Sequence, residues 1–289
     1  MADVIFVGLS TIEVIYRVDE FPKANEKVAA RSQDVFVGGP ATNACIACAH
    51  LGGKAALVTA VGRHPLAAMV REEAERYSIQ LMDLNPEFAG APAVSSVTVA
   101  RSGQRNVISA NAFRVHTPEE VVDRNALDRA RMVMVDGHHM QACQAWAAAA
   151  RALGKPVVLD GGSWKDRTDE LLKNVHTAIC SADFLPPGCE GSEQVVAYLR
   201  ARGVANVAIT HGAEPIEFVS GMSQGTLRVP QVDVADTTGA GDVLHGAYCY
   251  YAALGHGFIE ALSEAVEIAA QSCRYEGKRA WMGEAGTRE

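Results

Sequence analysis

The sequence predicts an α/β fold, with a central, mostly parallel sheet covered by helices on both faces and a second, smaller β-sheet. Between residues 132 and 273, short apolar runs alternate with longer amphipathic stretches. This alternation is typical of βαβ units, whose strands are buried on both faces. In the first 110 residues, several extended segments instead alternate polar and apolar residues. Such segments do not fit a parallel core, and they suit a small sheet at its edge.

The first 110 residues contain two expected helices among several strands. Pro40 stands in the first turn of an apolar stretch, 40–51, that Gly52-Gly53 closes, so we expect a helix there. Charged residues share one side of the stretch 65–77, which predicts an amphipathic helix. Residues 101–104 form a turn-like break between two extended segments. The expected strands are 4–7, 12–18, 27–37, 56–61, 94–100 and 106–109.

From residue 132 onward, strands and helices are expected to alternate up to a closing pair of helices. The expected strands are 132–135, 156–160, 177–180 and 204–210. The expected helices are 141–153, 190–202, 239–254 and 259–273. Because strands separated by helices pair in parallel, this region should form the core of a three-layer α/β/α arrangement.

Composition and charge exclude several classes of protein. The 289 residues are 48% hydrophobic and 21% charged, as in an ordinary globular protein. A net charge of -8, without a cluster of basic residues, argues against a nucleic-acid partner. No apolar run is long enough to cross a membrane. The 7 cysteines are odd in number and scattered, which predicts reduced thiols and a cytoplasmic protein.

The most informative segment is Asp236-Thr237-Thr238-Gly239-Ala240-Gly241-Asp242, followed by a helical stretch. A helix that begins among small residues presents free backbone N–H groups, which bind anions, and it allows a phosphate to approach closely. Asp242 adds a carboxylate beside this site, which suits the transfer of a phosphoryl group to an alcohol whose proton must be accepted. The alternative is an aspartate that caps a buried helix. The segment is not a Walker A loop, because no Lys-Ser/Thr follows Gly241.

Two segments resemble motifs of the ribokinase-like (PfkB) carbohydrate kinases. Residues 236–242 resemble the C-terminal signature of that family, and residues 38–43, Gly-Gly-Pro-Ala-Thr-Asn, resemble its N-terminal sugar-binding motif. The resemblance implies a single ribokinase-like domain over 1–289, with a lid over the sugar formed by segments 12–37 and 94–110. Among its branches the chain is most similar to ketohexokinases and sulfofructose kinases, although His138 stands where the latter carry an arginine.

The resemblance also implies roles for individual residues. Asp242 would be the catalytic base, and the amides of Gly239, Ala240 and Gly241 would hold the transferred phosphate. Residues expected to contact the sugar are Glu13, Gly38, Gly39, Asn43, Arg105 and His138, with Arg114 as a further basic residue after the lid. Residues expected to contact ATP are Ser181, Thr210, Gly212, Thr237, Ala270 and Cys273. Asp183 is the candidate ligand of the Mg²⁺ that accompanies ATP.

Several positions depart from the family pattern and leave alternatives open. Glu13 stands where the family has an aspartate that clamps two hydroxyls, and it could instead be a surface glutamate. Ser181 and Asp183 stand where many family members have an Asn-x-x-Glu element, so the residues that support Mg²⁺ would differ. After Gly212, Ala213 departs from the family's nucleotide loop, so the adenine side of the site would also differ. His138 could be a polar loop residue. A dependence on monovalent cations is left open.

Two other functions remain possible alternatives to a sugar kinase that phosphorylates a primary hydroxyl. A nucleoside kinase on the same fold would need an aromatic or apolar slot in the lid, where Phe36 is one of few aromatic residues. A catalytically silent regulator that binds sugar or nucleotide is the other. We expect a sugar and ATP as the small-molecule partners, and a homodimer that pairs through the lid.

Overall fold

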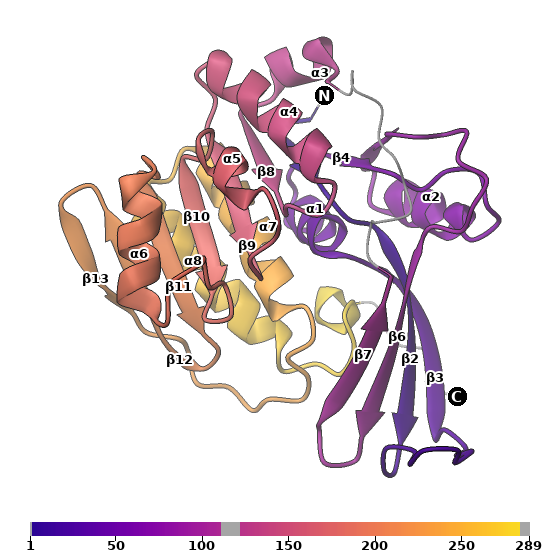
Figure 1. The fold of residues 1–289 in the computed structure, drawn as a ribbon. Helices are drawn as coiled ribbons and strands as arrows, with labels where there is room; N and C mark the ends of the chain where they lie inside the picture. The colour runs from indigo at the N-terminus through magenta and orange to yellow at the C-terminus, as the bar shows by residue number, and fades with distance from the viewer. Residues whose placement is uncertain (1, 111–121, 284–289) are drawn as a thin grey trace.

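The computed structural model, which describes residues 2–110 and 122–283, has the expected α/β fold with two sheets (Figure 1). In the larger, nine-stranded sheet, neighbouring strands pair in parallel except at the β11–β12 and β12–β13 pairs. Its strands, in spatial order, are β13 (Ser223–Leu227), β12 (Glu214–Ser220), β11 (Asn206–His211), β10 (Thr177–Ser181), β9 (Val157–Gly161), β8 (Met132–Val135), β1 (Val4–Val7), β4 (Ala55–Thr59) and β5 (Gln80–Asp83).

Helices cover both faces of this sheet, as Figure 1 shows. Along the central strand β1, Ile5 and Val7 pack toward one layer of helices, whereas Val4 and Phe6 pack toward the other. The first layer contains α3 (Arg124–Arg129), α4 (Met140–Ala152), α5 (Thr168–Leu172) and α6 (Ser192–Ala201). The second contains α1 (Pro40–His50), α7 (Ala240–Leu254) and α8 (Phe258–Ser272). The predicted three-layer fold is therefore confirmed.

The smaller sheet extends away from the core at the lower right of Figure 1. Its strands are, in order, β3 (Ser32–Gly38), β2 (Thr11–Val18), β6 (Ala93–Ala100) and β7 (Arg105–Ser109). The base of this sheet packs on α2 (Ala67–Arg76), where Ile12, Val37 and Val70 form a small apolar cluster. We refer to these four strands as the lid sheet.

The differences from the expected elements lie at sheet edges and in short helices. Strand β5 and the β12–β13 hairpin were not expected, because their mixed sequences, with Pro215 inside β12, lack a clear apolar period. The expected strand 27–37 begins only at Ser32. The short α3, α5 and the 3₁₀ turn η1 (Ala280–Met282) were also not expected. Within the described ranges, no helix is long and apolar enough to span a membrane.

Candidate active site

The candidate active site lies where the C-terminal ends of the parallel strands meet the first turns of α1 and α7. Asp136, directly after β8, connects these parts through hydrogen bonds to backbone amides. Its carboxylate accepts hydrogen bonds from the amides of Leu9 (2.8 Å), Ala41 (3.1 Å) and His138 (2.9 Å). Burial opposes ionisation of this carboxyl, but the neighbouring His138 and the hydrogen bonds outweigh it and hold its pKa well below the usual range. Asp136 therefore remains an anion that fixes the strand ends.

The first turn of α7 presents unpaired backbone amides. Gly239, at the N-cap, has a φ of 84°, which favours glycine. The Ala240 amide donates to the carbonyl oxygen of Thr237 at 3.2 Å. Among the described residues, the amides of Gly241 and Asp242 have no hydrogen-bond acceptor. Such a helix end binds an anion through its amides and its dipole.

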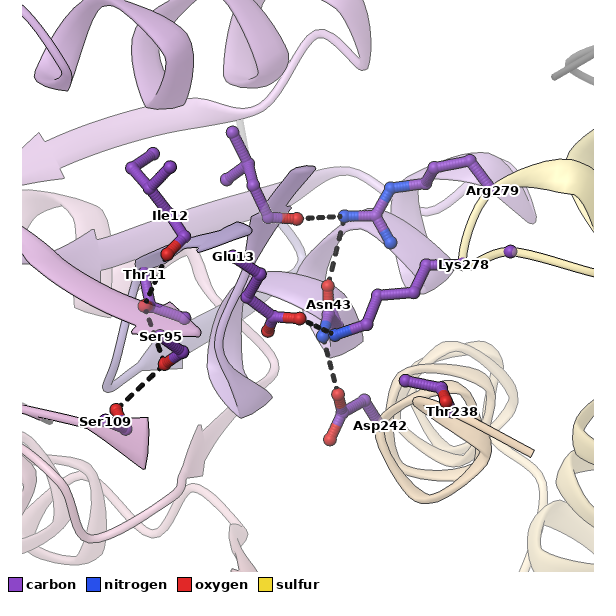
Figure 2. Close-up of polar contacts among 12 residues, drawn as sticks. Thr11, Ile12, Glu13, Asn43, Ser95, Ser109, Thr238, Asp242, Lys278 and Arg279 are labelled. Carbon is purple, nitrogen blue, oxygen red and sulfur yellow. Dashed lines mark hydrogen bonds and ion pairs between the residues drawn. The ribbon is translucent and has the colours of Figure 1, made fainter. Parts of the chain in front are cut away.

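Asp242 is held by a chain of hydrogen bonds that begins outside its own helix (Figure 2). The side-chain amide of Asn43 donates to Asp242 Oδ2 at 2.6 Å, and Arg279 Nη2 donates to Asn43 Oδ1 at 3.0 Å. Burial, and after it the charge of Asp160, raise the pKa of Asp242 to about 6. Lys278, the Asn43 hydrogen bond and His245 act in the opposite direction. A carboxyl with this pKa is an efficient proton acceptor near neutral pH.

The lid sheet contributes Glu13, whose carboxylate lies against Gly38. A Cβ atom at residue 38 would lie 2.0 Å from Glu13 Oε1, so only glycine leaves room for this carboxylate. Glu13 Oε2 accepts a hydrogen bond from Lys278 Nζ at 2.6 Å. Gly39 has a φ of 100°, and a Cβ atom there would lie 2.2 Å from the Leu9 carbonyl oxygen. Glycine is therefore required at residue 39 by the backbone, and at residue 38 it keeps the Glu13 carboxylate in its place.

His245 faces two backbone carbonyl oxygens at once. Its Nδ1 lies 2.7 Å from the oxygen of Gly241, and its Nε2 lies 3.0 Å from the oxygen of Ile179. In either neutral tautomer, one of the ring nitrogens donates to the carbonyl oxygen that it faces. Asp160 Oδ2 lies 3.6 Å from Nδ1. His245 thus connects the first turn of α7 to β9 and β10.

Two cavities lie near the start of α7, one lined by residues of that helix and the other by the loop that precedes it. One, of about 130 Å³, is mainly apolar and is lined by Ala240 and Gly241 together with four residues expected to contact ATP: Thr210, Gly212, Ala270 and Cys273. The other, of about 570 Å³, lies between the lid sheet and the loop before α7. Thr237 lines this second cavity, as does Arg105 of the lid sheet.

The remaining expected residues are placed apart from these cavities. Ser181 Oγ donates to the carbonyl oxygen of Gly162 at 2.8 Å and accepts from the exposed Asp183 amide at 3.2 Å. His138 is partly buried, with its Nδ1 3.4 Å from Asp136 Oδ1. No group of three potential metal ligands occurs within 2–110 and 122–283. Arg114 falls outside the described residues.

Sequence reasoning missed Lys278 and Arg279, both of which are buried. They follow the last helix, and their one visible signal is a pair of basic residues between Gly277 and Ala280. Besides Asn43, Arg279 bonds to the Val37 carbonyl oxygen at 3.1 Å and to Glu73 at 3.1 Å. Nothing in the local pattern indicates that this segment returns to the lid sheet.

Comparisons with known proteins agree with this geometry. A family model described as pfkB family carbohydrate kinase matches residues 1–282. The chain belongs to the pfkB family. A ribokinase of Haemophilus influenzae is 24% identical over 84% of this chain and 82% of its own length. An ATP-dependent ribose-1-phosphate kinase of Halopiger xanaduensis is 25% identical over 86% and 84%, respectively.

Solved structures of similar proteins share the fold. A putative ribokinase from Agrobacterium tumefaciens aligns with a TM-score of 0.85, at 23% identity over 99% of both chains. Arabidopsis thaliana ribokinase, solved with ribose and ATP, aligns with a TM-score of 0.79 at 22% identity, over 98% of this chain and 96% of its own. As a pfkB carbohydrate kinase, the protein is an ATP-dependent phosphotransferase of a family that acts on small sugars. The expected family and fold class are therefore confirmed.

Proposed function

We propose that this pfkB kinase transfers the γ-phosphate of ATP to a primary hydroxyl of a small ketose or pentose, with Asp242 as the base. One observation carries the proposal: the helix start with the unpaired amides of Gly241 and Asp242 borders an apolar cavity, and the Asp242 carboxylate is linked through Asn43 and Arg279 to Val37 of the lid sheet. The apolar cavity suits an adenine ring, and the sugar would lie between Asp242 and the lid sheet near Glu13. The phosphate would cross from the nucleotide to the sugar at the helix end.

The proposed reaction moves one proton and one phosphoryl group. The sugar hydroxyl oxygen forms a bond to the γ-phosphorus of ATP, and the bond from that phosphorus to the β,γ-bridging oxygen breaks, which releases ADP. Asp242 accepts the hydroxyl proton. Asn43, held by Arg279, orients the carboxylate through its 2.6 Å hydrogen bond. Glu13 and the backbone at Gly38 and Gly39 would orient the sugar.

We propose that Thr210, Gly212, Ala270 and Cys273 contact the nucleotide, because they share the apolar cavity with the first turn of α7. Mg²⁺ enters with ATP and would neutralise charge on the phosphates. Asp160 and Asp183, at the ends of β9 and β10, offer the oxygen ligands that Mg²⁺ prefers. Thr237 would act beside the phosphates and Arg105 beside the sugar, since both line the cavity under the lid sheet. Ser181 and His138 line neither cavity, and their expected roles have no such support.

The two alternative functions have less support. A nucleoside kinase needs an aromatic or broad apolar slot for a base, but none of the described residues that line the cavity under the lid sheet is aromatic. A silent binder has no need for a carboxyl with a pKa raised to about 6 beside an anion site.

The proposal is tested by ADP release from Mg-ATP with ketohexoses, aldopentoses, sugar acids and nucleosides. Asp242→Asn serves as the catalytic control, and Asp233→Asn, on the exposed loop before the motif, as the matched control. Sugar-dependent ADP release that is lost only in Asp242→Asn supports the proposal. Nucleoside-dependent release supports the first alternative, and retained ATP binding with no release for any acceptor supports the second.

We also propose that two lid sheets pair in a homodimer. Strand β7 is the edge of the lid sheet, and its Val107 and Ile108 are 55% and 77% exposed. An exposed apolar edge strand is a ready partner for a second strand. Light scattering of wild type and Ile108→Lys tests the dimer, which the variant should weaken.

The seven cysteines are free thiols, which supports a reducing compartment such as the cytoplasm.

A further inference from the structure

Lys278 is a buried ammonium group inside the candidate acceptor site. Its side chain is 7% exposed, and it comes from the segment after α8 rather than from the motifs at 38–43 or 236–242. Lysine is rarely buried unless it is paired, and here the partner is Glu13 of the lid sheet, 11% exposed. The site therefore contains a positive charge that neither motif supplies.

The Glu13–Lys278 pair retains unused hydrogen-bonding capacity. An ammonium has three N–H donors, and within the described part of the chain Lys278 uses one, to Glu13 Oε2. Glu13 Oε1 has no donor there, and it lies over Gly38. The pair can thus donate to one ligand oxygen and accept from a neighbouring hydroxyl at the same time.

The position of the pair relates it to the catalytic carboxyl. Figure 2 shows the bond from Lys278 to Glu13 and, in the same region, the bond from Asn43 to Asp242. The charge of Lys278 is also close enough to favour ionisation of Asp242. A sugar whose hydroxyl contacts Asp242 can therefore extend its next oxygen atoms toward this pair.

We propose that Lys278 is a specificity-determining residue that, together with Glu13, binds two adjacent oxygens of an uncharged polyhydroxy acceptor and disfavours acidic ones. Lys278 donates to one oxygen, and Glu13 accepts from the neighbouring hydroxyl. The inference rests on the proposed sugar kinase function and adds the charge class of its acceptor.

The balance of charges favours a neutral acceptor. Glu13 and Asp242 are two carboxylates that share the single ammonium of Lys278, and Asp160 adds negative charge beside them. Of the other basic groups of this region, Arg279 pairs with Glu73, and Arg17 pairs with Asp34 and Glu276. Arg105 is in register with Val99 and Arg17, whereas Glu13 is in register with Ser95, so Arg105 lies farther along the lid sheet. A carboxylate, sulfonate or phosphate on the acceptor would add repulsion at this position.

A purely structural role is the competing explanation. Lys278 could simply connect the segment after α8 to the lid sheet, as the Arg17–Glu276 ion pair does at 3.2 Å. Loss of such a connection would lower stability and affect all acceptors alike. A specificity role instead changes the ratio between neutral and acidic acceptors, which a structural role leaves unchanged.

The test compares kcat and KM for D-fructose and D-ribose with those for D-gluconate and D-ribonate. The variants are Lys278→Met, Lys278→Arg and Glu13→Gln, and Arg202→Met is the matched control, since it removes a 2.6 Å ion pair far from the site. Lys278→Met should raise the KM of the better neutral sugar about 10- to 100-fold, because it loses a hydrogen bond to a charged group. Its KM for ATP should change by less than about twofold, and Lys278→Arg should recover part of the loss.

Glu13→Gln removes the carboxylate that neutralises the Lys278 ammonium. The kcat/KM for the acid, divided by the kcat/KM for the neutral sugar, should therefore rise about tenfold or more. Calorimetric binding of the same four compounds without ATP gives a second readout. The inference is overturned if wild type prefers the acids, or if the ratio is unchanged in Glu13→Gln and the neutral KM is unchanged in Lys278→Met. Absence of ADP release from wild type with every acceptor would instead overturn the proposed function.

Discussion

Replacement of Asp242 by asparagine should remove catalysis and raise stability together. The asparagine oxygen can still accept the Asn43 hydrogen bond, so the site should keep its shape. It cannot accept the sugar proton, and loss of a general base lowers kcat by about 10²- to 10⁴-fold. The affinity for ATP should remain within about twofold, because the backbone amides and the apolar cavity are unchanged.

The stability gain follows from the raised pKa of Asp242, about 6 against 3.8 for an unperturbed carboxyl. Each unit corresponds to about 1.4 kcal/mol, so the ionised carboxyl destabilises the fold by at most about 3 kcal/mol. Asp242 is partly exposed even though its carboxyl lies deep in the site, and solvent screening lowers this figure. At pH 7 to 8, the free energy of unfolding of Asp242→Asn should therefore exceed that of wild type by about 1–3 kcal/mol.

The sign of the pH dependence follows from the same shift. Because the pKa is higher in the folded state, the stability from protonation of Asp242 is present below the unfolded pKa near 4 and is lost as the pH rises through about 6. The advantage of the variant should thus disappear near pH 4. In wild type, kcat/KM should fall as the pH falls through about 6, since the base becomes protonated.

Denaturant unfolding of wild type and Asp242→Asn between pH 4 and pH 8, with turnover measured in parallel, checks both effects. Turnover of the variant within tenfold of wild type would refute the assignment of the base. A variant less stable than wild type at pH 7 would refute the inference that the folded state disfavours ionisation of the Asp242 carboxyl.

Three further changes test other parts of the site. Gly38→Ala should displace Glu13 and raise the sugar KM about tenfold or more, with Gly191→Ala, which has open space around it, as the unaffected control. Ala270→Phe should fill the apolar cavity and raise the KM for ATP about tenfold, since overpacking costs about 1–3 kcal/mol; an unchanged KM would place adenine elsewhere. His245→Phe should lower the free energy of unfolding by about 1–3 kcal/mol, because the carbonyl oxygens of Gly241 and Ile179 lose the ring nitrogens that they face, and an unchanged stability would contradict these contacts.

Much of the fold could be predicted because its signals are local. The buried strands of the core, such as Met132–Val135, are continuous apolar runs, and the helices between them carry apolar stripes. Pro40 and the 239–241 segment mark helix starts by their backbone preferences. Strand β5 and the β12–β13 hairpin were missed because sheet edges are only partly buried, so their residues follow no clear period.

The site was predictable only where its residues stand together in the chain. The sequence by itself determined the helix start at Gly239, the position of Asp242 in its first turn and the glycines of 38–39, since each depends on backbone conformation or on near neighbours. Only the tertiary structure decided that Arg279 orients Asn43, that Lys278 pairs with Glu13, and that Asp160 faces His245. Lys278 and Glu13 are 265 residues apart. Such contacts depend on how the sheets and the segment after α8 pack, and no local pattern encodes that packing.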